Sequence, residues 1–157
     1  MTVKSIVTLL PLWIASLCSF PQAAAQVNVA VVVNAGNATT NVSAGDLRKI
    51  FSGEKRSWSG GQPIKIVVRG PGCLERLVLL RLLAMSEGEY KQYWTAQVLR
   101  GEADAEPLTV PSIGMQMESL KVFPGAITLM SAQDVKPGMK VLKVDGILPG
   151  APNYPIH

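Results

Sequence analysis

Histidine and cysteine are nearly absent from this chain of 157 residues, and their scarcity excludes several kinds of chemistry. The single histidine is His157, the last residue, so a Ser-His or Cys-His catalytic pair has no plausible base. Clusters of histidine or cysteine that would indicate a metal site are missing as well. Cys18 falls in an N-terminal leader-like segment, which leaves Cys73 without a disulfide partner. We therefore expect a domain that is not an enzyme, holds no cofactor or metal, and is stabilised by packing.

Long apolar runs are lacking beyond the N-terminus. Lys4, the apolar run from Ile6 to Leu17 and three alanines that end at Ala25 are typical of a secretory signal. No later stretch approaches eighteen uncharged apolar residues, the length that a membrane span needs. We predict a signal peptide at residues 1–25 and one soluble domain at residues 26–157, located in the periplasm or secreted.

Charge of either sign is unevenly distributed. Six basic residues and two acidic residues lie between Asp46 and Arg69, whereas Glu102 to Glu118 contains four acids and no base. The basic stretch either steers an anion toward the domain or forms an ordinary solvated face, and the sequence leaves both interpretations open. Basic residues are not interleaved with aromatic ones, so a nucleic-acid partner is not expected.

Strand-like and helix-like segments alternate along the chain. The β-branched run from Val27 to Asn34 is typical of a strand that is covered on both faces. Serine followed three residues later by an acid predicts helix starts after Ser43 and after Ser86. Further strands are predicted at Lys65–Arg69, Ile127–Met130 and Val141–Val144, and further helices at Leu74–Met85 and Pro111–Phe123. This order predicts a three-layer α/β domain with a largely parallel central sheet.

The predicted helix Leu74–Met85 is apolar on nearly every side. Either it is buried beneath the helix that begins after Ser86, or it exposes an apolar strip. In the second case Leu79, Leu80 and Leu83 would contact another protein or a second copy in a homodimer.

A candidate anion site lies where the second predicted strand ends. Arg69 is followed by Gly70, Pro71 and Gly72, and a helix is predicted to begin near Cys73. Free backbone N–H groups and the positive end of the helix dipole would favour an anion there, and Arg69 could hold it with a bidentate fork. The alternatives are ordinary turn chemistry and a surface arginine. Cys73 is either a reactive thiol at the helix start or a small apolar residue that fills space.

Several motifs resemble those of the periplasmic phosphate-binding proteins that serve ABC transporters. Ile50-Phe51-Ser52-Gly53, followed by Trp58 and Gly61, is similar to the I-F-x-G and W-x-x-G stretch of that family. Similar segments follow along the rest of the chain: Trp94 with Gly101, Pro124-Gly125-Ala126-Ile127, and Val144-Asp145-Gly146 with Pro149 and Tyr154. The resemblance implies a single lobe of the type II periplasmic binding fold.

The resemblance also implies a ligand, namely phosphate or another small oxyanion, and a possible ABC transporter or other envelope protein as partner. Members of the family place R-x-x-G-S-G-T at the anion site, and Arg69, Gly70, Gly72 and Cys73 fall on that motif here. Thr39 and Thr40 are further candidate donors, in a loop that is either a remnant of a second anion-binding loop or an ordinary polar loop.

This chain departs from the family in two respects. The hydroxyl donors of the motif are missing, and Glu75 places a carboxylate in the first turn of the helix, where it would compete with a bound anion. Residues 26–157 also suffice for about one of the two lobes that close on a ligand in transport receptors. The alternative is therefore a periplasmic interaction protein that has kept the fold and lost ligand binding.

Overall fold

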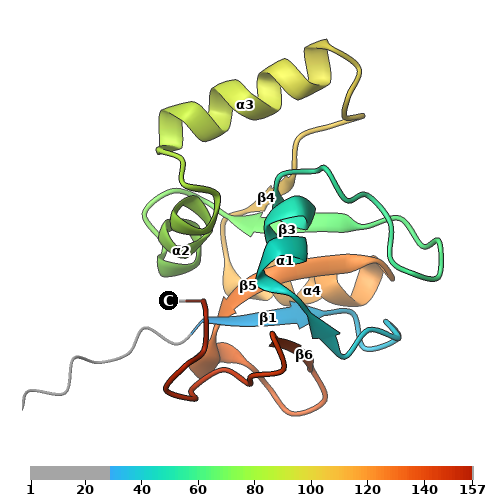
Figure 1. Cartoon of the computed structure of the whole chain (residues 1–157), viewed down its shortest axis with the longest axis vertical. Helices are drawn as coiled ribbons and strands as arrows, with labels where there is room; N and C mark the ends of the chain where they lie inside the picture. Colours follow the sequence, from blue (N-terminus) through green and yellow to red (C-terminus); the bar gives the residue numbers. More distant parts are fainter. Residues whose placement is uncertain (1–28, 157) are drawn as a thin grey trace, which may run out of the picture.

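The computed structural model describes residues 29–156, so the predicted signal peptide and its cleavage site lie outside the described part. Within it the strands form one sheet in the order β2-β6-β1-β5-β3-β4 (Figure 1). The predictions at Lys65–Arg69, Ile127–Met130 and Val141–Val144 are confirmed, whereas β2 and β4 were not predicted. The strands are β1 (Val29–Val33), β2 (Asn41–Val42), β3 (Lys65–Arg69), β4 (Leu108–Val110), β5 (Ala126–Ser131) and β6 (Lys140–Val144).

The sheet is mixed, with more parallel than antiparallel neighbours. β3 runs parallel to β4 and β5, and β2 runs parallel to β6. β1 lies at the centre and is antiparallel to both of its neighbours, β5 and β6. The predicted α/β class with a largely parallel sheet is confirmed, and β1 is the strand that departs from it.

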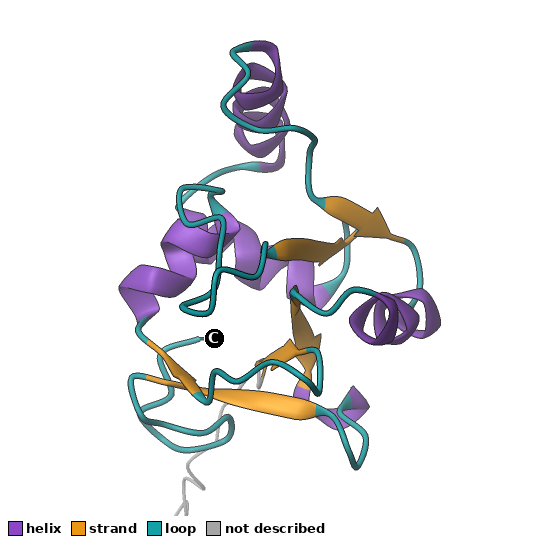
Figure 2. Ribbon diagram, turned by 90° about the vertical axis from the view of Figure 1, so that its right-hand side faces the viewer, coloured by secondary structure: helices purple, strands orange, loops and turns teal. Residues whose placement is uncertain are grey.

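Helices cover both faces of the sheet and make the predicted three layers (Figure 2). In β1 the side chains of Val29, Val31 and Val33 join the core beneath α1 and α2, whereas Ala30 and Val32 join the core beneath α4. A strand between two apolar layers has no polar face, which explains its unbroken apolar sequence. The helices are α1 (Ala44–Phe51), α2 (Leu74–Leu83), α3 (Glu87–Leu99) and α4 (Ile113–Val122), with a short 3-10 helix η1 (Ala132–Asp134) after β5.

Serine side chains start three of these helices. Ser43 accepts a hydrogen bond from the backbone N–H of Asp46, and Ser86 accepts one from Glu89 in a reciprocal capping box. Both starts were predicted from the spacing of serine and acid. Ser112 caps α4 in the same way through the N–H of Met115. No helix in residues 29–156 is both long and apolar enough to cross a bilayer.

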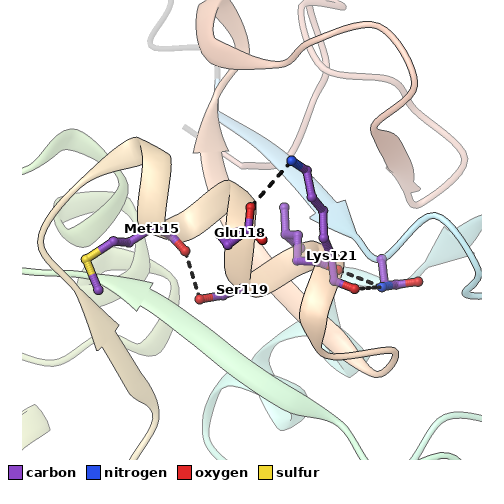
Figure 3. A network of polar contacts seen from close by, with 6 residues as sticks. Met115, Glu118, Ser119 and Lys121 are labelled. Atoms are coloured by element: carbon purple, nitrogen blue, oxygen red, sulfur yellow. Dashed lines mark hydrogen bonds and ion pairs between the residues drawn. The ribbon is translucent and has the colours of Figure 1, made fainter.

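The end of α4 is tied to the loop that follows β1. The side-chain amide of Asn34 donates to the carbonyls of Leu120 (2.6 Å) and Lys121 (3.3 Å), which helix geometry leaves free (Figure 3). Figure 3 also shows the hydroxyl of Ser119 bonded to the carbonyl of Met115 and the Lys121–Glu118 ion pair on the same helix. The loop after β1 therefore lies at the C-terminal end of α4.

Polar residues of α2 are buried while two of its leucines face solvent. The buried side chains include Glu75, Arg76 and Leu79, whereas Leu74 and Leu77 are 37% and 52% exposed. Of the two predicted alternatives, burial beneath the next helix is wrong, because α2 packs on β3 and β5 and beside α1. Leu79, at 2% exposure, cannot belong to a contact strip, so any apolar strip on α2 consists of other residues.

Arg76 links the start of α2 to the start of α3. Its guanidinium donates to both carboxylate oxygens of Glu87, at 2.5 and 3.0 Å, and stacks 4.0 Å from the centre of the Tyr90 ring. Arg76 is only 5% exposed, so this pairing offsets the cost of removing its charge from water. α3 otherwise stands apart from the sheet, beyond the β4 edge (Figure 1).

The Arg76–Glu87 pair makes stability depend on pH. The hydrogen bond from Arg76 holds the pKa of the Glu87 carboxyl below its ordinary value of 4.5. Because the folded pKa is the lower one, the stabilisation is complete well above pH 4.5 and is lost as the pH falls through the folded pKa. We expect Glu87→Gln to cost about 1 kcal/mol at neutral pH, because the Glu87 side chain remains half exposed, and to cost less at an acidic pH well below 4.5.

Urea unfolding of both proteins at the two pH values measures this difference. Glu118→Gln is the matched control, since its ion pair with Lys121 is exposed on both sides. An equal loss from Glu87→Gln at both pH values would contradict the assignment.

Candidate functional site

Arg69, the last residue of β3, turns inward at the edge of the sheet where α2 and α4 begin. Its Nη2 lies 3.4 Å from the sulfur of Cys73 and 3.4 Å from the carbonyl oxygen of Pro111, just before α4. Its Nε is buried and has no hydrogen-bond partner among residues 29–156. Two helix N-termini and one guanidinium therefore concentrate positive potential at this edge.

The turn between β3 and α2 leaves backbone donors free, as predicted. Cys73 occupies the N-cap position of α2 but makes no side-chain cap. In the described part of the chain, the backbone N–H groups of Leu74, Glu75 and Arg76 take part in no hydrogen bond. Gly72, with φ of 85°, provides the left-handed residue that the turn requires. Arg69, Gly70, Gly72 and Cys73 thus lie together in one turn.

Glu75 places a buried carboxylate at the same end of the parallel strands as Arg69. It is 6% exposed, and its Oε1 accepts a hydrogen bond from the backbone N–H of Ser131 at 3.2 Å, where β5 ends. Arg69 and Glu75 line a common void that has no room for a water molecule. The protein's own carboxylate is therefore buried at the start of the helix that carries the free amides.

Thr39 and Thr40 lie at the other end of the sheet, which corrects their grouping with Arg69. Their loop follows β1, which is antiparallel to β5, and Asn34 at its start bonds to the C-terminal end of α4. Arg69 contacts Pro111 at the N-terminal end of that helix, about 15 Å away along ten residues. The backbone N–H of Thr39 bonds to the side chain of Asn37, which is ordinary turn chemistry.

Two contributors to the site were not predicted. Ser131 supplies the amide that holds Glu75, and Pro111 supplies the carbonyl that holds Arg69. Both follow from the sheet, because β3, β4 and β5 are parallel neighbours and their carboxyl ends meet at one edge. No group of three or more His, Cys, Asp or Glu side chains within residues 29–156 could hold a metal ion.

Comparison with known proteins assigns the fold. Residues 20–150 match the family model of the PBP superfamily domain. The chain belongs to this family. The PBP domain is similar to a structure from Clostridium perfringens with bound phosphate, assigned to the phosphate ABC transporter substrate-binding proteins (17% identity, TM-score 0.62). It is also similar to an ABC-type phosphate transport receptor from Vibrio cholerae (22% identity, TM-score 0.62).

The PBP domain spans a little under half of these relatives. The alignments cover 76% and 78% of this chain but 46% and 48% of the two solved chains. PstS from Borrelia burgdorferi gives the same result, with 17% identity, a TM-score of 0.57 and 49% of its chain covered. No curated protein matches the chain. The resemblance predicted from the motifs is confirmed at the level of family and fold.

Proposed function

We propose that this PBP domain is an exported binding module that takes phosphate or another small oxyanion at Arg69 and the first amides of α2. The observation that carries the proposal is the inward-turned guanidinium with an unpartnered buried Nε beside unbonded helix N–H groups. Donors that converge on one point at a helix N-terminus favour an anion. The phosphate bound to the Clostridium perfringens relative supports the ligand class.

Binding of the oxyanion is weak in this proposal. Glu75 places a buried carboxylate in the first turn of α2, where it repels an anion, and the serine and threonine of the family motif are replaced by Cys73 and Glu75. A hydrogen bond to a charged group contributes about 1.5–3 kcal/mol, so two missing donors lower affinity on the order of a hundredfold or more. A domain of one lobe also cannot enclose the ligand by hinge closure.

Calorimetric titration with phosphate and with sulfate tests the site. We expect weak binding by the wild type, no binding by Arg69→Ala, and binding at least about tenfold tighter by Glu75→Thr, which removes the competing charge and restores a hydroxyl. Arg48→Ala is the matched control, because this exposed arginine lies on α1 in the same basic stretch. Equal heats from the wild type and Arg69→Ala, or no gain in Glu75→Thr, would reject the proposal.

A second candidate is a non-catalytic interaction protein that keeps the fold without a ligand. Two observations favour it: the void between Arg69 and Glu75 has no room for a water molecule, and Leu74 and Leu77 are exposed on the same helix as Glu75. Its partner would be a second copy of the chain or an envelope protein such as an ABC transporter. The same titration separates the two candidates, because this one requires that neither the wild type nor Glu75→Thr binds either anion.

A further inference from the structure

A cavity of about 330 Å3 lies under α3, at the end of β3 away from Arg69. The β3–β4 ladder begins at the pair Val67–Leu108. Residues 63–66, at the start of β3 and just before it, are not paired with residues 103–107, which lead into β4; both segments line the cavity together with the residues that follow α1. The two segments lie apart until this first pair, and the gap between them forms the cavity.

The inner lining of this cavity is apolar. Trp94, at 3% exposure, extends from α3 into the lining, and Ile64, Ile66 and Pro107 lie around it. The ring of Trp94 is held in place because its outer edge packs against Gly53 at the end of α1. A rigid aromatic surface beside branched side chains favours an apolar ligand group.

Charges of opposite sign line the cavity on its two flanking segments. Lys55 and Arg56 belong to the segment after α1, and Asp104 and Glu106 belong to the segment before β4. These groups do not pair across the cavity. Among the described residues Lys55 pairs with Asp46 (3.3 Å), and Glu106 accepts a hydrogen bond from Thr95 (3.3 Å).

We propose that this cavity binds a zwitterion with apolar side chains, of the size of a dipeptide. The carboxylate would lie toward Lys55 and Arg56, the ammonium toward Asp104 and Glu106, and the side chains against Trp94. Size favours two residues over one, because a cube of 330 Å3 has edges of about 7 Å and two extended residues span about 7 Å. This site is separate from the oxyanion site and does not depend on it.

NMR titration of the whole domain with Leu-Leu, observed at the indole N–H of Trp94, tests the site. Leu-Leu is expected to shift this signal, and blocking either terminus, as N-acetyl-Leu-Leu or as Leu-Leu amide, is expected to weaken binding about tenfold through loss of one charge-assisted contact. No shift of the Trp94 signal up to the solubility limit, or equal binding of the blocked peptides, would overturn the proposal.

Variants assign the contacts and separate this site from the oxyanion site. Asp104→Asn combined with Glu106→Gln is expected to weaken Leu-Leu about tenfold and to leave N-acetyl-Leu-Leu unchanged, because that peptide lacks the ammonium. Both residues are exposed, so the fold does not depend on them. Arg69→Ala is expected to bind Leu-Leu like the wild type. Loss of Leu-Leu binding in Arg69→Ala, or an equal loss for both peptides in the double variant, would contradict the assignment.

Discussion

Gly125→Ala is expected to destabilise the domain by roughly 3 kcal/mol or more, enough to prevent folding of a marginally stable chain. A Cβ atom on Gly125 would lie 1.8 Å from the carbonyl oxygen of Pro63. The neighbouring backbone cannot move away, because the carbonyl of Gly125 accepts hydrogen bonds from the indole of Trp58 (3.1 Å) and from the N–H of Lys65 (3.0 Å). Relief of the clash would therefore break buried hydrogen bonds that hold β3 beside β5.

Urea unfolding measures this effect, with Gly60→Ala as the matched control. A Cβ atom on Gly60 meets nothing within 4 Å, and its backbone is not left-handed, so we expect a change of less than about 0.5 kcal/mol. Similar stability of the two variants would show that the contact with Pro63 is not as rigid as described.

Gly53→Ala is expected to cost roughly 2–3 kcal/mol for two separate reasons. Gly53 has φ of 78°, which an alanine adopts at a cost of about 1 kcal/mol. Its Cβ would also lie 2.6 Å from the outer edge of the Trp94 ring, and overpacking of this kind costs about 1–3 kcal/mol. The backbone N–H of Gly53 bonds to the carbonyl of Ile50, so the residue cannot shift freely.

Two further variants separate the two costs of Gly53→Ala. Gly101→Ala carries a similar left-handed φ of 68° without any contact within 4 Å, so it should show the conformational cost alone. In a Trp94→Phe background, which removes the outer ring atoms, Gly53→Ala is expected to cost at least about 1 kcal/mol less than in the wild type. Equal costs in both backgrounds would show that the ring does not limit the site.

These contacts explain why the family motifs could be read from the sequence while the ligand could not. Gly53 packs against Trp94, and Trp58 donates to the carbonyl of Gly125, so segments that carry the resemblance contact one another. They hold β3, α1 and α3 in place and are remote from Arg69. Their presence therefore indicates the fold and says little about whether an anion is bound.

The elements that sequence analysis located are those with a strong local signal. Lys65–Arg69 was located with its exact bounds, and the starts of α1 and α3 followed from serine caps. β2 and β4 are two and three residues long. Segments this short cannot show the alternation of apolar and polar residues that predicts a strand. The antiparallel direction of β1 could not be predicted from the sequence either, because it depends on pairing with strands about 100 residues later in the chain.

The candidate site was predicted only where its residues are adjacent in sequence. Arg69 to Cys73 form one turn, so their proximity is local, and Glu75 could be placed in the first turn of the same helix. The contacts of Arg69 with Pro111 and of Glu75 with Ser131 arise from sheet order. Thr39 and Thr40 were grouped with Arg69 as the remnant of a second anion-binding loop, and the antiparallel direction of β1 separates them from Arg69.

The central position of β1 also determines when the domain can fold. β1 is the first described strand to be synthesised, yet its partners β5 and β6 are made last. Until β5 and β6 leave the ribosome, the five apolar residues of β1 have no strand on either side. Long-range pairing of this kind slows folding. The core around β1 therefore cannot form before β6 has been made, an interval in which chaperones can engage the nascent chain.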